Sequence, residues 1–221
     1  MKTIIIVAAV LCAALVGTGV YLAVKPQPVG PRDLPIDQSY TDRVSKQAWI
    51  KGSATPTVTV TEYADYQCPY CMEIYSGLNA AIDATSSYAQ LDFHVYPLYS
   101  IHNKAKLAAQ AAESAGRQGK YWEMHDLLFS KQTSWENDTI FSFPNTLDGY
   151  AKDLQLNISQ FDKDMKDPSV QTQIDADVAL GDKIPVQGTP TLLINGKQVN
   201  NPPYDKDSLV KLIEAARDAK S

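Results

Sequence analysis

The feature that most constrains this chain is its pair of cysteines, Cys68-Pro69-Tyr70-Cys71. An apolar run over residues 58–63 precedes the pair, and a pattern of helical periodicity continues from it to about Ser86. Two intervening residues let the sulfurs meet within one helical turn, so the pair can form a disulfide or stand as a dithiol. The predicted order is a strand, a short loop and a helix that begins at the first of two cysteines. This arrangement indicates redox chemistry.

The position of the pair at the start of a helix predicts different roles for the two thiols. Pro69 suits the first helical position, because its fixed φ fits the helix and its missing N–H would have no partner there. Cys68 then lies at the helix N-terminus, where free N–H groups and the positive end of the helix dipole stabilise a thiolate. We therefore expect Cys68 to be the exposed nucleophile and Cys71 to be the inner, resolving thiol.

A structural disulfide or half of a metal site are the alternatives for this pair. A zinc site needs two more ligands at suitable spacing, and outside the pair the chain has only Cys12 and the scattered His94, His102 and His125. His94 lies in an alternating strand and His125 on a helix, so both are expected to pack rather than to catalyse. We expect no metal and no cofactor other than a redox-active disulfide between the paired cysteines.

The N-terminal segment predicts export. Residues Ile4 to Val24 carry no charge and match the roughly 20 residues that a membrane-spanning helix needs. Lys2 and the amino terminus precede this run, which predicts that the N-terminus stays inside and the rest lies outside. We therefore interpret residues 1–25 as a signal anchor that crosses the cell membrane once, with the folded part on the extracytoplasmic side.

A cleaved signal peptide, which would leave a secreted or periplasmic protein, is the alternative for this segment. Against cleavage, Tyr21-Leu22-Ala23 puts a bulky residue where a small one is required. A lipoprotein at Cys12 is disfavoured because Leu11 precedes it, where such sites have a small residue. On either reading the folded part works in an oxidising compartment, where a lone cysteine pair persists as a disulfide or passes one on.

The rest of the chain divides by its composition and periodicity. Residues 26–46 are rich in proline and polar residues, which predicts an extended linker. Residues 47–102 hold strand patterns and the cysteine pair, residues 103–183 are a contiguous helical block, and residues 184–221 return to a strand and a final helix.

The individual elements follow from the same patterns. Asn195-Gly196 is a strong two-residue hairpin signal, and Asp205 or Asp207 can cap the last helix. Strands are expected at about 47–51, 57–63, 91–96, 191–194 and 197–199, and helices at about 68–86, 104–115, 121–129, 145–154, 159–165, 168–180 and 208–219.

This order of elements, together with two short phrases, resembles a known family. The phrases are residues 62–71, EYADYQCPYC, and residues 188–191, GTPT. The chain resembles the DsbA-like family of exported thiol-disulfide oxidoreductases, in a membrane-anchored form, from about Ala48 to Ala219. The resemblance implies an α/β, thioredoxin-like fold: a central mixed β-sheet flanked by helices, with an inserted helical domain.

The resemblance also implies roles for single residues. Cys68 looks like the attacking thiol and Cys71 like its partner. Pro190 resembles the cis-proline beside the active site, and Thr189 the residue whose backbone binds an extended substrate peptide. The residues expected at the substrate are therefore Thr189, Pro190, Pro69 and Tyr70.

Glu62 matches a buried acid that assists proton transfer at the resolving cysteine. A buried carboxyl has a raised pKa and could accept a proton near neutral pH. Because strand faces alternate, a Glu62 side chain that points outward is the alternative. Tyr70 departs from strongly oxidising relatives, which often carry His there, so Cys68 has one fewer cause for a very low pKa.

Three functions remain open from the sequence. The first is an exported oxidase that introduces disulfide bonds into secreted or cell-surface proteins through the Cys68–Cys71 disulfide, with a quinone-linked membrane partner to reoxidise it. The second is an exported reductase or isomerase, and the third a peptide-binding module with a structural disulfide. No dimerisation module is visible, so we expect a monomer. With 20 basic against 25 acidic side chains and no basic cluster, nothing favours nucleic-acid binding.

Overall fold

The computed structural model describes residues 48–184 and 186–219. The signal anchor expected over residues 1–25 and the linker expected over 26–46 lie outside the described residues. Within the two described ranges, no helix is both long and apolar enough to cross a bilayer.

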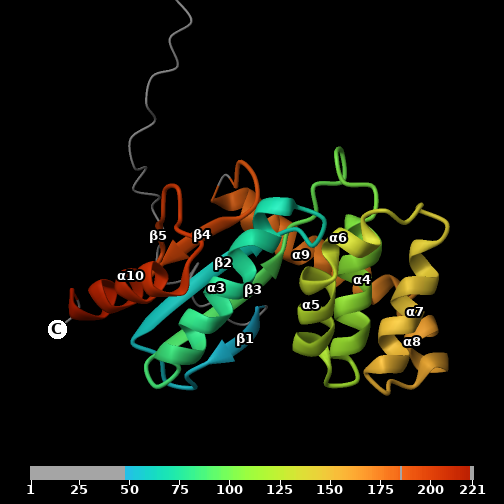
Figure 1. Ribbon diagram of the computed structural model, residues 1–221, viewed down its shortest axis with the longest axis horizontal. Helices are drawn as coiled ribbons and strands as arrows, with labels where there is room; N and C mark the ends of the chain where they lie inside the picture. The colour runs from blue at the N-terminus through green and yellow to red at the C-terminus, as the bar shows by residue number, and fades with distance from the viewer. Residues whose placement is uncertain (1–47, 185, 220–221) are drawn as a thin grey trace, which may run out of the picture. The chain divides into compact units, whose positions relative to one another are not determined.

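A mixed sheet with the strand order β1-β3-β2-β4-β5 forms the centre of the fold (Figure 1). Strand β2 runs parallel to β3, whereas β1 pairs antiparallel with β3, β4 with β2, and β5 with β4. Both central strands are buried almost throughout, including polar residues such as Glu62, Asp92 and His94. The described strands are β1 (Trp49–Gly52), β2 (Val58–Ala64), β3 (Ala89–Val95), β4 (Thr191–Ile194) and β5 (Lys197–Gln198).

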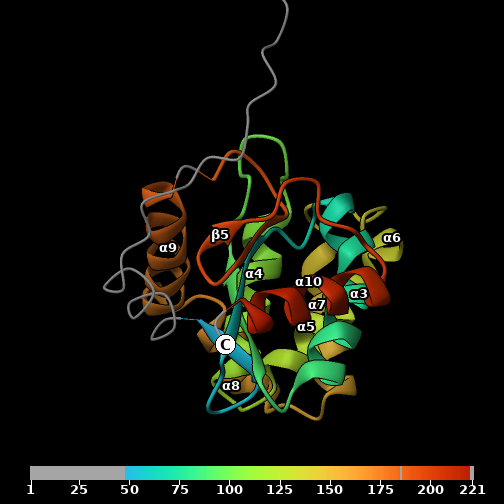
Figure 2. The ribbon, with the colours of Figure 1, turned by 90° about the vertical axis from the view of Figure 1, so that its left-hand side faces the viewer.

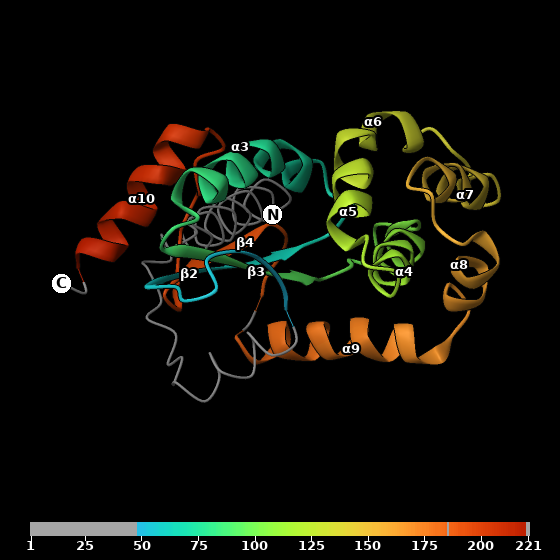
Figure 3. The same ribbon diagram turned by 90° about the horizontal axis from the view of Figure 1, so that it is seen from below.

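Helices cover both faces of this sheet. Helix α3 (Pro69–Thr85) connects β2 to β3 and packs against α10 (Lys206–Asp218). Figures 2 and 3 show α3 and α10 on one side of the sheet and α9 (Pro168–Lys183) on the other. A Cβ on Gly77 of α3 would lie 1.9 Å from the carbonyl oxygen of Tyr204, so the loop before α10 approaches α3 through this glycine. The mixed sheet flanked by helices confirms the expected fold class.

The helical block between β3 and β4 packs around helix α4 (Ala105–Gly116). This alanine-rich helix is buried along most of its length, because its short side chains let neighbouring helices approach closely. Gly116, one residue beyond the end expected for this helix, is its last residue, and a Cβ there would lie 2.5 Å from the Trp49 ring. The block contains α9 and, among the described residues, the helices α4 (Ala105–Gly116), α5 (Tyr121–Ser130), α6 (Gln132–Trp135), α7 (Phe143–Asp153) and α8 (Ile158–Asp164).

Two of the three histidines are packed in the interior, as expected. His94 on β3 is fully buried, and its Nδ1 lies 2.9 Å from Oδ1 of Asp177 on α9. His125 on α5 is also buried, and it lies edge-on to Phe93 with ring centroids 4.7 Å apart. Both side chains are therefore packed core residues, as their positions on a strand and a helix predict.

Candidate functional site

The two cysteines lie at the junction of β2 and α3. Cys68 is the N-cap residue of α3, Pro69 is its first residue, and Cys71 lies in its first turn. Both are free thiols in this structure. Cys71 is fully buried and Cys68 is 4% exposed. The expectation of an exposed Cys68 is therefore wrong.

The reason for this difference is the loop that precedes β4. The Cys68 thiol donates a hydrogen bond to the carbonyl oxygen of Thr189, with 3.2 Å between sulfur and oxygen. The Thr189–Pro190 peptide bond is cis, as the resemblance implies, and both residues are partly exposed. Antiparallel pairing of β4 with β2 brings this loop to the end of β2, against a cysteine 121 residues away in sequence.

The two thiols differ in acidity. The pKa of Cys68 is lowered to about 6, mainly by a hydrogen bond from the Cys71 thiol and against the effect of burial. The Thr189 side chain and the backbone N–H groups of Cys71 and Tyr70 lower it further. Burial is the main cause that raises the pKa of Cys71 well above the usual thiol value. Above a pH of about 6 the pair therefore holds one thiolate, on Cys68, which has then lost the proton that the thiol donates to Thr189.

This difference predicts the pH dependence of alkylation. In the reduced protein, the rate of Cys68 modification by iodoacetamide should rise with pH around a midpoint near 6, because the thiolate is the reactive form. Peptide mapping by mass spectrometry should find the label on Cys68 and not on Cys71, because the raised pKa of Cys71 keeps its thiol protonated. A midpoint near the ordinary cysteine value, about 8.5, would contradict the assignment of the thiolate.

Glu62 lies in the middle of the sheet. It is in register with Phe93 of β3 and Leu192 of β4, and it is 4% exposed. The alternative of an outward-facing side chain is therefore wrong. Burial raises the pKa of Glu62 to about 8, and its charge is among the causes that raise the pKa of Cys71. Glu62 is thus a protonated carboxyl at neutral pH, within electrostatic reach of the resolving thiol.

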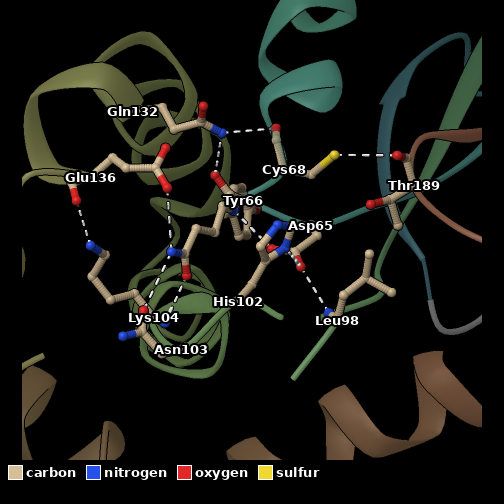
Figure 4. A network of polar contacts seen from close by, with 11 residues as sticks. Asp65, Tyr66, Cys68, Leu98, His102, Asn103, Lys104, Gln132, Glu136 and Thr189 are labelled. Carbon is tan, nitrogen blue, oxygen red and sulfur yellow. Dashed lines mark hydrogen bonds and ion pairs between the residues drawn. The ribbon is translucent and has the colours of Figure 1, made fainter. Parts of the chain in front are cut away.

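Sequence reasoning missed Asp65, which organises the loop before the cysteines (Figure 4). This carboxylate is fully buried and accepts hydrogen bonds from the backbone N–H groups of Gln67 and Leu98, each at 2.8 Å. Its Oδ2 also lies 2.7 Å from Nδ1 of His102. A buried carboxylate needs such partners, and an aspartate three residues before a buried cysteine was the signal that could have found it.

The helical block also contacts this loop. The backbone N–H of Lys104 donates to Oε1 of Gln67 at 2.7 Å. Nε2 of Gln132, on α6, donates to the carbonyl oxygens of Tyr66 and Cys68. Nothing in the sequence points to Gln132, because a helix of four residues is too short to show a period and its partners lie 64 and 66 residues away.

Comparison with known families decides the classification. A family model described as thioredoxin matches residues 45–215. The chain belongs to the thioredoxin family. Among solved structures it is similar to a thioredoxin-like oxidoreductase from Silicibacter pomeroyi DSS-3, at 25% identity and a TM-score of 0.67, over 83% of this chain and 99% of that one. Oxidised BdbD from Bacillus subtilis is also 25% identical, with a TM-score of 0.67, over 78% of this chain and 94% of that one.

These relatives confirm the resemblance to DsbA-like proteins. The thiol-disulfide exchange protein α-DsbA2 from Wolbachia pipientis shares the fold, with 19% identity and a TM-score of 0.65 over 83% of this chain and 92% of that one. This member of the thioredoxin family is a protein thiol-disulfide oxidoreductase. The alternative of a peptide-binding module with an inert disulfide is therefore set aside.

The curated relatives are much longer than this chain. Na+/H+ antiporter NhaA 3 from Salinispora tropica is 34% identical over 167 residues, which are 76% of this chain and 24% of that protein. NhaA 1 from Mycolicibacterium gilvum is 32% identical over 199 residues, 87% of this chain and 29% of that protein. The chain spans about a quarter of the length of these relatives, so their names assign no ion transport to it.

Proposed function

We propose that this oxidoreductase is an exported oxidase that introduces disulfide bonds into secreted or cell-surface proteins. The observation that carries the proposal is the unequal acidity of the two thiols, with the pKa of Cys68 near 6 and that of Cys71 raised by burial. A stabilised Cys68 thiolate favours the dithiol form of the protein, and this makes its disulfide a good electron acceptor. Export rests on the uncharged segment from Ile4 to Val24.

The proposed reaction begins with the Cys68–Cys71 disulfide. A substrate thiolate attacks Cys68 Sγ, the S–S bond breaks, and Cys71 leaves with the electron pair. A second substrate thiolate then attacks the substrate sulfur of the mixed disulfide and displaces the Cys68 thiolate. The substrate loses two electrons and forms a disulfide, and the protein gains them and becomes the dithiol.

Glu62 is the proposed proton donor and acceptor for Cys71. The leaving Cys71 sulfur is fully buried, so it takes up a proton rather than remaining charged. With a pKa of about 8, Glu62 holds a proton at neutral pH and can supply it. When the disulfide forms again, the same carboxylate would remove the proton from the Cys71 thiol.

The proposed substrate-binding surface surrounds Cys68. Thr189 and Pro190 border the sulfur on one side, and an extended peptide would bind along their backbone. On the other side Pro69 is exposed and the Tyr70 ring is 58% exposed. These side chains offer apolar contacts that do not depend on one substrate sequence.

The dithiol must pass its two electrons on before a second turnover. A quinone-linked membrane protein is the proposed acceptor, and a single N-terminal anchor would keep the two proteins in the same membrane. We propose that the chain works as a monomer.

A reductase or isomerase is the second candidate, and Tyr70 favours it. A tyrosine at this position adds no positive charge beside Cys68, and such a charge would lower its pKa further. The chemistry is the same with the electrons flowing in the opposite direction.

The reduction potential of the full chain against glutathione buffers distinguishes the two directions. Reference values are about −120 mV for DsbA and about −270 mV for thioredoxin, a gap of about 7 kcal/mol for two electrons. We expect a value above about −200 mV, on the DsbA side of this range. A value near that of thioredoxin would overturn the oxidase and favour the reductase.

A further inference from the structure

Gln132 belongs to the helical block, but its side chain reaches the active-site loop. The residue is 1% exposed, and its Nε2 lies 2.8 Å from the carbonyl oxygen of Tyr66 and 2.9 Å from that of Cys68 (Figure 4). Carbonyl oxygens only accept hydrogen bonds, so the NH2 end of the amide must face them. One buried amide therefore uses both of its protons on the backbone that carries the nucleophile.

The Gln132 contacts add to two hydrogen bonds that already hold the backbone of Cys68. Its N–H donates to the carbonyl oxygen of Asp65 at 3.0 Å, and its carbonyl oxygen accepts from the N–H of Met72 at 3.2 Å. Asp65 and Met72 belong to the loop and helix of the motif itself, whereas Gln132 comes from a separate part of the fold. The orientation of Cys68 thus depends on the helical block.

The short helix that carries Gln132 is itself held firmly. Nζ of buried Lys104 donates to the carbonyl oxygens of Glu136 and Asp138, at 2.7 and 2.9 Å, just beyond the end of α6. Within α6, Nε1 of Trp135 donates to the carbonyl oxygen of Leu128 at 2.7 Å. Because these hydrogen bonds hold the helix in place, the Gln132 amide is preorganised and needs little rearrangement when the sulfur changes its charge.

We propose that Gln132 is a positioning residue for disulfide exchange. By holding the carbonyls of Tyr66 and Cys68, it keeps the Cys68 sulfur directed at the N–H groups that begin α3, and it thereby sets how oxidising the Cys68–Cys71 disulfide is. The inference rests on the redox activity of the pair and not on the direction of electron flow proposed above.

The sign of the effect follows from the charges involved. The amide NH2 brings partial positive charge beside Cys68 and aligns the sulfur with further N–H donors, which favours the thiolate over the uncharged disulfide. Loss of the amide should therefore destabilise the dithiol form relative to the disulfide. The variant protein should be a weaker oxidant.

The test is the full-length Gln132→Met variant, which keeps the length of the side chain and removes the donors. Its equilibrium constant for oxidation of glutathione should fall about tenfold, which corresponds to about 30 mV for two electrons. The midpoint of Cys68 alkylation should rise in the same protein. Leu147→Ala, in the fully buried core of α7, is the matched control: it should lower the Tm and leave both redox readouts unchanged.

The two readouts separate positioning from simple packing. If Gln132→Met lowers the Tm but keeps the wild-type equilibrium constant and alkylation midpoint, Gln132 is only structural and the inference is wrong. Should the methionine variant not fold, Gln132→Asn shortens the side chain by one CH2 and cannot reach both carbonyls, and the same shifts are expected from it. Because each result is a difference from wild type, it stands whether the protein proves to be an oxidase or a reductase.

Discussion

Replacing Cys71 with serine is expected to stop turnover and to leave the protein joined to its substrates through Cys68. With no second thiol in the first turn of α3, the pair cannot form its own disulfide. The Cys68 thiolate can still attack a disulfide of a substrate protein, whose other sulfur leaves as a thiolate, and no Cys71 thiol is present to resolve the mixed disulfide that results. The remaining Cys68 keeps its place at the helix N-terminus and beside the Thr189 carbonyl. Non-reducing electrophoresis of cells that express the full-length variant should therefore show adducts that disappear with dithiothreitol.

The double variant with serine at both Cys68 and Cys71 is the matched control, and it should show no adducts. Serine differs from cysteine by one atom, so the fold is expected to survive at a cost of about 1 kcal/mol for each buried hydroxyl. If the single variant traps nothing while Cys68 remains reactive to iodoacetamide, the assignment of Cys68 as the attacking thiol fails.

Replacing Glu62 with glutamine is expected to stabilise the protein and to slow disulfide exchange. The unfolded chain ionises this carboxyl near 4.5, whereas the native protein keeps it protonated up to about 8. Between these two values the unfolded state binds fewer protons than the native state, so the free energy of unfolding falls as the pH rises. Glutamine removes this penalty, a gain of about 3 kcal/mol at pH 7 that falls to about 0.4 kcal/mol at pH 4.5 and vanishes at lower pH.

Urea unfolding of the reduced protein across this pH range measures the effect. Glu73→Gln, on the exposed face of α3, is the matched control and should change neither the pH dependence nor the rate of exchange. Slower reoxidation of the dithiol is expected only in the Glu62 variant, because its amide cannot take the proton from Cys71. Parallel stability curves for Glu62→Gln and wild type would show that Glu62 does not titrate in this window.

Local patterns were enough to predict most elements and the cysteine chemistry. Pro69 and Cys68 define a helix start through their own backbone preferences, and β4 was recognised from a short apolar run before a hairpin signal. The end of α9 was predicted less well, because the sequence pattern places it at 180 and the helix continues to Lys183.

The face of β2 to which Glu62 belongs could not be read from alternation. Val60 and Tyr63 lie on opposite faces of this strand, and both are fully buried. When helices cover both sides of a sheet, the period of two loses its information about exposure. The resemblance to a family, not the strand pattern, suggested the buried acid.

What the sequence determined by itself was the chemistry: two sulfurs within one helical turn, the first at a helix N-terminus, require only neighbouring residues. What the tertiary structure decided was the environment of those sulfurs. The Thr189 carbonyl that covers Cys68 and the Gln132 amide that holds its backbone come from 121 and 64 residues away. Hydrogen bonds act over about 3 Å, so contacts between distant segments exist only once the sheet and the helical block have brought those segments together.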